Sequence, residues 1–180
     1  KRDRPPRAFE YGYPINFDVV TGFAEYRDLQ RHRMLTQQRQ DMNVSLGYSV
    51  PEEIEEMGKS EVVQECFERA ESLHSDLIKA GLIREAQYAP LFNHFIRWNM
   101  GMNAREMGHL TELRSQKAGH PKYRRTVQVM AKLYLQKHPG MESILKFVDY
   151  NDYDQGITRA EQEARTARKS LSTGVFDDMD

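Results

Sequence analysis

Two stretches of the chain alternate apolar and polar residues with the period of a half-buried β-strand. The apolar positions of the first stretch are Phe9, Tyr11, Tyr13, Ile15 and Phe17. Pro14 falls on the opposite phase, which suits an edge strand or a bulge. Asp18 follows directly and is expected to cap a helix that begins near Val19.

The second alternating stretch leads into a predicted helix start. On one side it carries Phe92, Ile96, Trp98, Met100 and Met102, with Asn93, Arg97 and Asn99 opposite. This pattern predicts a strand that is covered on one face. Asn103 and Glu106 then have the spacing of a capping box. The helix that they open is expected to bury Met107, Leu110 and Leu113.

Three-and-four spacing of apolar residues predicts helices between these strands. The helix near Val19 would pack through Val19, Phe23, Tyr26 and either Leu29 or Gln30. Residues 37–50 lack long periodicity and indicate a loop, and Pro51 suits the first turn of a short acidic helix. A longer helix is expected from Ser60 to the glycine cap at Gly81. Its stripe is Val63, Phe67, Ala70, Leu73 and Leu77.

Two proline-led helices complete the pattern. Pro121 precedes a helix whose apolar face is Val127, Met130, Ala131 and Tyr134. Pro139 begins a short one through Ile144, Leu145 and Val148. From Asn151 onward apolar residues become sparse, and residues 159–169 indicate an exposed charged helix or a solvated tail. The expected fold is mixed α and β with helix in excess.

Length and charge limit the classes of protein that fit. A chain of 180 residues suits one compact domain, here residues 1–150 with a charged tail at 151–180, and the charged, proline-containing start suggests the later part of a longer polypeptide. The net charge of -1 gives no general field for nucleic acid, although residues 1–7 and the arginines at 27–39 raise that alternative. No apolar run approaches the roughly 20 residues of a membrane span, so we expect a cytoplasmic protein with no membrane partner.

Several kinds of catalytic chemistry lack their sequence patterns. Cys66 is the only cysteine, and its apolar surroundings predict a small buried side chain rather than a catalytic thiol. Glycine-rich phosphate loops of the two familiar types are absent. No histidine and carboxylate spacing indicates a bound metal. We therefore predict neither a metal site nor a cysteine nucleophile.

Arginines gather at two places instead. Arg27 and Arg31 are one helical turn apart, and Arg31 opens the triplet Arg31-His32-Arg33. The planar arginine side chain suits phosphate and carbonyl ligands because it offers two directed donors. A solvated helix end paired with carboxylates such as Asp28 explains the charges of this first group equally well. The second group is Asn103, Arg105, His109 and Arg114.

Taken together, the two groups resemble a known family. Arg31-His32-Arg33 followed by Thr36, and later Asn103-Ala104-Arg105 with Leu113-Arg114, are similar to the two sequence blocks of flavin-dependent thymidylate synthases. The similarity covers roughly residues 8–150. It implies an α+β, helix-rich fold like that of thymidylate synthase-complementing proteins, with a small antiparallel sheet flanked by helices. It also implies a homo-oligomer, tetramer or dimer, with FAD bound across subunit interfaces.

The resemblance also implies roles for individual residues. FAD would be held by Arg31, His32, Arg33, Asn103, Arg105 and His109. The nucleotide dUMP would be bound by Arg31, Arg39 and Arg114, and Arg114 would act catalytically by polarising the uracil. NADPH would reduce the flavin, and methylenetetrahydrofolate would supply the one-carbon unit. This route needs no cysteine nucleophile.

The sequence departs from the family pattern near the expected nucleotide. Asp41 stands in place of a serine, while Asn43 and Gln87 stand where arginines would hold the phosphate. His109 replaces an asparagine, and Arg39 offers a cation from a different position. Three functions follow as alternatives: an active thymidylate synthase, a flavoprotein with another substrate, or a catalytically degenerate domain that serves oligomerisation or a partner catalytic domain.

Overall fold

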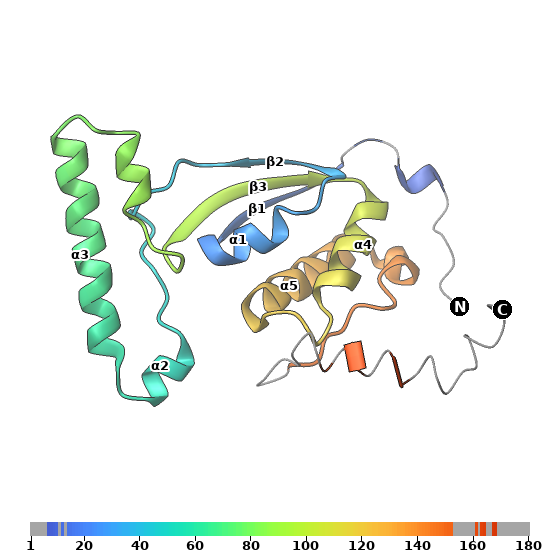
Figure 1. Cartoon of the computed structure of the whole chain (residues 1–180). Helices are drawn as coiled ribbons and strands as arrows, with labels where there is room; N and C mark the ends of the chain where they lie inside the picture. The colour runs from blue at the N-terminus through green and yellow to red at the C-terminus, as the bar shows by residue number, and fades with distance from the viewer. Residues whose placement is uncertain are drawn as a thin grey trace, which may run out of the picture. The chain divides into compact units, whose positions relative to one another are not determined.

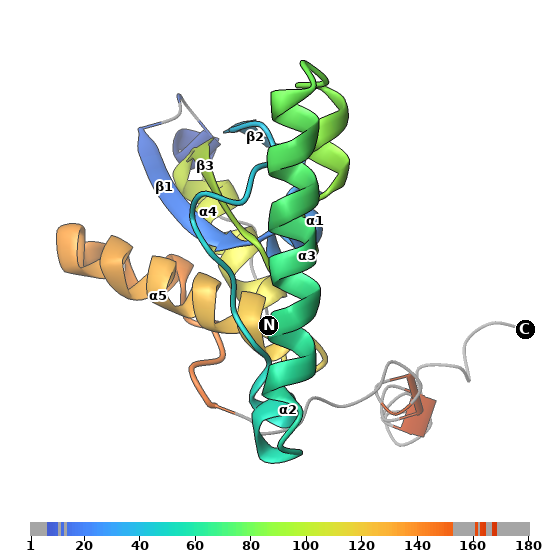
Figure 2. The same ribbon diagram turned by 90° about the vertical axis from the view of Figure 1, so that its left-hand side faces the viewer.

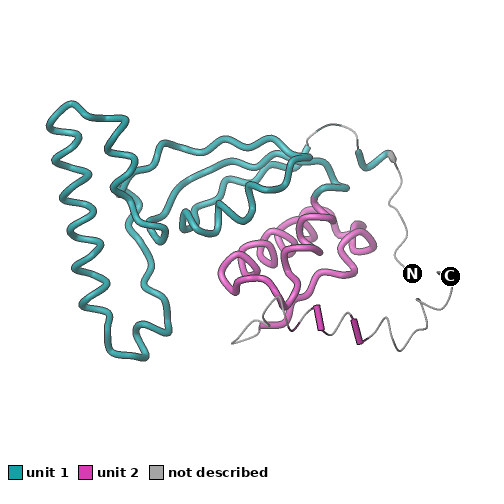
Figure 3. Tube along the Cα trace, in the orientation of Figure 1, with its two compact units in different colours: residues 1–106 teal, residues 107–180 magenta. Residues whose placement is uncertain are grey.

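The computed structural model describes residues 7–10, 12, 14–152, 161, 163, 164, 167 and 168. The chain divides into two compact units, residues 1–106 and 107–180 (Figure 3). A short 3-10 helix, η1 (Arg7–Glu10), opens the described part. The predicted tail at 151–180 lies largely outside the described residues.

A small antiparallel sheet forms the centre of the first unit, as predicted (Figure 1). Its strands are β1 (Ile15–Gly22), β2 (Leu35–Arg39) and β3 (Phe95–Met102), in the order β1-β3-β2. In the register, Ile15 and Leu35 both lie opposite Met102. Strand β2 occupies the start of the segment at 37–50 that was expected to be a loop, so that part of the prediction is wrong.

One face of β3 is buried and the other is exposed, as its alternation predicted. Ile96, Trp98, Met100 and Met102 are buried, while Arg97 and Asn99 are exposed. Helix α1 (Phe23–Leu29) packs on the buried face, where the ring of Tyr26 meets that of Trp98 edge-on at 5.0 Å. The indole nitrogen of Trp98 donates to Thr21 Oγ1 at 3.1 Å. The central strand and α1 therefore share one core.

The first helix begins four residues later than the sequence indicated. Val19 to Gly22 continue β1, where each residue pairs with β3. The backbone N–H groups of Phe23 and Ala24 then donate to the carbonyls of His94 and Phe92 at 3.1 and 3.0 Å. These contacts satisfy donors that a helix start otherwise leaves unpaired. Asp18 is therefore a strand residue, and the predicted cap is wrong.

Two further helices lie between β2 and β3 in the sequence of the first unit. They are the short acidic α2 (Glu52–Glu56) and the long α3 (Ser60–Lys79), which lies beside η2 (Glu85–Tyr88) (Figures 1 and 2). Gly81 ends α3 with a φ of 78°, a value that favours glycine. Phe67 is buried under the ring of Tyr48, with centroids 3.8 Å apart.

Two side chains of α3 contradict the sequence interpretation. Leu73 was expected to lie in the packed stripe but is 52% exposed. Cys66 was expected to be buried and is exposed. Only Phe67 and Ala70 of α3 are buried among the described side chains. The packed stripe of this helix is therefore narrower than its apolar periodicity suggested.

The second unit is helical in its described part. Helix α4 (Ala104–Arg114) runs through the unit boundary, and α5 (Pro121–Lys137) and η3 (Pro139–Ile144) follow. The predicted inner face of α5 is buried at all four positions, Val127, Met130, Ala131 and Tyr134. Leu113 was expected to be buried but is 50% exposed. No helix among the described residues is long and apolar enough to cross a membrane.

Candidate functional site

The arginine triplet lies in the loop that joins α1 to β2, immediately after the helix rather than within its last turn. The backbone N–H of His32 donates to the carbonyl of Leu29 at 3.2 Å, which turns the chain off the helix end. The side chain of His32 is buried, whereas those of Arg31 and Arg33 are exposed. The triplet therefore separates into one inward and two outward side chains.

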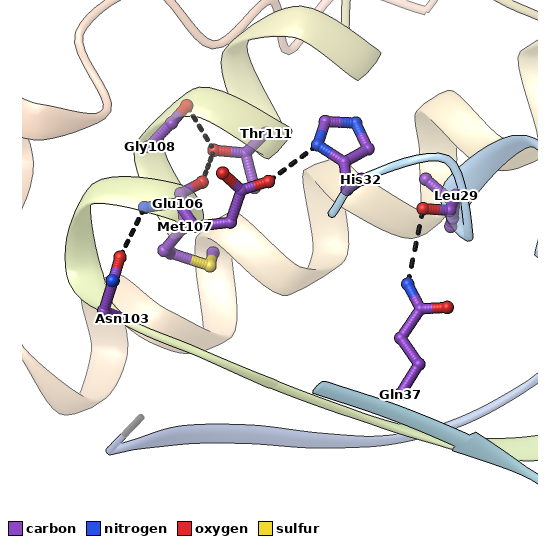
Figure 4. A network of polar contacts seen from close by, with 8 residues as sticks. All are labelled: Leu29, His32, Gln37, Asn103, Glu106, Met107, Gly108 and Thr111. Atoms are coloured by element: carbon purple, nitrogen blue, oxygen red, sulfur yellow. Dashed lines mark hydrogen bonds and ion pairs between the residues drawn. The ribbon is translucent and has the colours of Figure 1, made fainter. Parts of the chain in front are cut away.

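His32 is held by a carboxylate from a distant part of the first unit. Its Nδ1 lies 2.7 Å from Glu106 Oε1, and the two side chains are only 4% and 6% exposed (Figure 4). Asn103 Oδ1 accepts the backbone N–H of Glu106 at 2.9 Å, as a helix cap does. The sequence predicted the cap and missed the pair with His32. This pair anchors the triplet to the start of α4.

Asn103 and Arg105 are both used within the first unit. The amide nitrogen of Asn103 donates to the carbonyl of Glu10 at 3.0 Å. Arg105 forms an ion pair with the carboxylate of the same Glu10. These contacts fasten η1 to the beginning of α4. Glu106, which pairs with His32, directly follows Arg105 in the sequence, but the described contacts of Asn103 and Arg105 are made with the protein.

Arg31 and Arg33 differ from the other predicted cations. In the part of the chain that the structure describes, neither side chain forms a hydrogen bond or an ion pair. Arg39 donates to the carbonyl of Gln40 at 2.8 Å. Arg27 lies over the ring of Phe92 at 5.3 Å within α1, whereas Arg31 lies beyond the end of that helix. Two exposed arginines that are two positions apart on one loop suit a polyanionic ligand such as a diphosphate.

The loop after β2 is closed by its own side chains. Asn43 Nδ2 donates to the carbonyl of Asp41 at 3.0 Å, and the hydroxyl of Ser45 donates to Asn43 Oδ1 at 2.6 Å. Gln87 Oε1 accepts the backbone N–H of Met42 at 3.3 Å. Asn43 and Gln87 therefore both contact the same loop, as the expected phosphate-binding positions would. Their side chains are neutral amides, however, and they form hydrogen bonds with the loop backbone.

The remaining predicted residues belong to the second unit. His109 is exposed, and Arg114 is half-buried at the end of α4. The guanidinium carbon of Arg114 lies 5.7 Å from the centre of the Tyr123 ring. No sequence pattern indicated Tyr123, because a single tyrosine early in a helix is also typical of ordinary packing.

The fold and these residues define a class of protein: an α+β domain that displays arginines on a loop anchored to a helix start, an arrangement suited to an anionic ligand. The family model described as thymidylate synthase complementing protein matches residues 6–140. The chain belongs to the thymidylate synthase complementing protein family, which confirms the resemblance drawn from the two arginine blocks.

Three curated relatives extend this comparison. The chain is 42% identical over 165 residues to a UPF0159 protein of Chlamydia muridarum and 37% identical over 165 residues to one of Chlamydia pneumoniae. It is 33% identical over 177 residues to a UPF0159 protein of Thermoplasma acidophilum. The matches cover 92%, 92% and 95% of this chain but 30%, 30% and 34% of those proteins. The chain thus spans about a third of the length of these relatives.

Proposed function

We propose that this chain binds FAD and dUMP and takes part in the reductive methylation of dUMP to dTMP, with methylenetetrahydrofolate and NADPH as co-substrates. The observation that carries the proposal is the exposed pair Arg31 and Arg33, displayed on a loop that the buried His32–Glu106 contact fixes. Family membership supports the same reaction class.

The available donors fit a flavin dinucleotide. Its diphosphate is a compact dianion, and the side chains of Arg31 and Arg33 have no described protein partner that would have to be displaced. Asn103, Arg105 and His109 complete the proposed set, while His32 orients the loop. Bound FAD supplies the redox chemistry, and the protein supplies orientation and charge.

Arg114 is proposed to bind the pyrimidine. Two N–H groups on one edge of a guanidinium can donate to a carbonyl oxygen and stabilise negative charge as it develops on the ring. Arg31 and Arg39 would contribute cations toward the nucleotide phosphate. In this proposal the site is completed in a homo-oligomer, a tetramer or a dimer, because the resemblance places FAD across subunit interfaces.

A first experiment measures flavin. The purified chain, incubated with FAD and desalted, is expected to absorb between 350 and 500 nm. An Arg31→Ala/Arg33→Ala double variant should lose most of this absorbance. Arg84→Ala, which removes another exposed arginine of the first unit, is the matched control and should retain it. Wild-type protein that takes up no FAD would refute the proposal.

A second experiment measures turnover. NADPH oxidation by the flavin-loaded protein is expected to depend on dUMP and methylenetetrahydrofolate and to yield dTMP. Arg114→Ala should abolish this dependence. Flavin uptake without any effect of dUMP would instead identify a flavoprotein with another substrate.

A second candidate function is a non-catalytic domain that supports oligomerisation or a partner catalytic domain. The closed loop around Asn43 favours it, because neutral amides and Asp41 occupy the positions expected to grip a phosphate. A carboxylate within about 4 Å of a phosphate would cost on the order of 1–4 kcal/mol. This function predicts a colourless protein whose mass in solution exceeds that of one chain.

A further inference from the structure

The second unit contains an aromatic ring directed at the proposed catalytic arginine. Arg114 is the last residue of α4 and Tyr123 is the third residue of α5. Their guanidinium carbon and ring centre are 5.7 Å apart, within the roughly 6 Å over which a cation is attracted to an aromatic face. Both side chains are half-buried, so the contact is partly shielded from water.

The backbone between the two helices leaves room for this ring. Gly119 is buried against Tyr123, and a Cβ at position 119 would lie 2.7 Å from the tyrosine hydroxyl oxygen and 2.8 Å from ring carbon Cε2. Real Cβ atoms do not approach other atoms so closely. A residue with a side chain at position 119 would therefore push the ring away from its present place.

The start of α5 is itself fixed relative to the end of α4. The buried side chain of Arg124 donates through Nε to the carbonyl of Ser115 at 2.9 Å, directly after Arg114. His120 caps α5 by accepting the backbone N–H of Lys122 on Nδ1 at 3.3 Å. The residue before Tyr123 and the residue after it are thus both tied by hydrogen bonds.

We propose that Tyr123 is a positioning residue for Arg114. A guanidinium that rests on a ring through its face still has its N–H groups directed outward from its edge. The ring would therefore restrict the rotation of Arg114 and keep the donating edge in one orientation. This inference rests on the proposed function, in which that edge meets the uracil carbonyl.

Three variants test the role of the ring. Tyr123→Phe keeps the aromatic face, whereas Tyr123→Leu removes it and keeps apolar volume. Tyr150→Leu is the control, because Tyr150 makes a similar ring contact with Lys132 at 5.8 Å in the same unit. The first readout is NMR of the Arg114 side chain, whose protons lie in the ring current of Tyr123. The second is kcat/KM for dUMP with flavin-loaded protein.

We expect Tyr123→Leu to shift the Arg114 resonances toward ordinary arginine values and to lower kcat/KM by about five- to thirty-fold, the range of one cation–aromatic contact. Tyr123→Phe and Tyr150→Leu should match the wild type in both measurements. Unchanged Arg114 resonances in Tyr123→Leu would overturn the inference, as would equal losses in the Phe and Leu variants.

The two readouts separate this inference from the proposed reaction. A wild-type protein without dUMP-dependent turnover, in which Tyr123→Leu still shifts Arg114, would refute the reaction and support the contact. Turnover that is lost in Arg114→Ala but unchanged in Tyr123→Leu would support the reaction and overturn the positioning role.

Discussion

Acid should destabilise the first unit through His94. The side chain of His94 is fully buried, and its Nδ1 accepts the backbone N–H of Leu91 at 2.8 Å. The proton of the neutral ring is therefore on Nε2, which has no hydrogen-bond partner among the described residues. Glu71 Oε1 lies 3.7 Å from it, beyond hydrogen-bonding distance. A second proton would have to go to Nδ1 and would displace the Leu91 contact.

Burial holds the pKa of His94 below its ordinary value of 6.5, although the nearby charge of Glu71 opposes the shift. Near pH 6.5, His94 therefore takes up a proton in the unfolded chain but stays neutral in the folded chain. The contribution of His94 to the free energy of unfolding is therefore fully present above pH 6.5. It falls as the pH decreases toward the lowered pKa of His94 in the folded chain. The slope contributed by His94 is at most about 1.4 kcal/mol per pH unit.

Urea unfolding between pH 7.5 and 5.5 measures this loss. Trp98 is the only tryptophan, and it is buried in the first unit, so its fluorescence reports on this unit. His94→Asn keeps an acceptor for Leu91 but cannot titrate, so its stability should vary less with pH even though lost packing lowers it overall. His138→Asn, at an exposed position of the second unit, should behave like the wild type. An equal pH slope for wild type and His94→Asn would refute the reasoning.

Three further substitutions test packing and buried polar contacts. Glu106→Ala should destabilise the first unit by about 1–3 kcal/mol in urea unfolding because it removes the buried contact with His32, and Glu106→Gln should cost less. Gly108→Ala should lower the melting temperature, followed by the loss of helical circular dichroism, since a Cβ there would lie 2.7 Å from the carbonyl oxygen of Ile144. That clash of about 1–3 kcal/mol outweighs the roughly 1 kcal/mol gain in helix propensity. Arg124→Met should destabilise the second unit by about 1–3 kcal/mol, measured by the same melting, because a buried carbonyl loses its donor.

Local sequence patterns correctly predicted the elements in which the spacing of apolar residues coincides with the buried face. The alternation through Ile96, Trp98 and Met100 predicted β3 with the correct buried face. Helix α5 was likewise predicted with its inner face. In both segments the side-chain period, the propensity and the burial agree, and this agreement makes a short pattern informative.

The wrong predictions of where strands and helices begin occur where pairing with β3 decides the structure. Val19 and Val20 suit a helix face as well as a strand, and only their pairing with Trp98 and Arg97 extends β1. The segment at 35–39 shows no clear alternation of apolar and polar residues, because both faces of β2 are partly exposed. This strand is held by its backbone pairing with β3. Such contacts join residues distant in the sequence, so local patterns do not reveal them.

The site shows the same division between residues and their contacts. The sequence identified His32 and Asn103, but their partners Glu106 and Glu10 are separated from them by 74 and 93 positions. The chain has 27 acidic residues, and nothing local indicates which of them lies buried beside a histidine. The motif therefore indicated which loop and helix start to consider, and only the structure shows which residues contact each other there.

The contact between His32 and Glu106 affects what the arginine triplet can show about function. A buried His32 joined to Glu106 positions the loop whether or not a ligand is bound, so the presence of this histidine is explained by the fold and is weak evidence for a ligand. Arg31 and Arg33 have no such described role, so these two exposed cations beside a buried histidine are more informative about an anionic ligand. The loop at Asn43 bears on the binding of dUMP, because the amides of Asn43 and Gln87 form hydrogen bonds with the loop backbone. The proposed binding of FAD and the proposed binding of dUMP therefore need separate tests, and flavin uptake alone would not establish thymidylate synthesis.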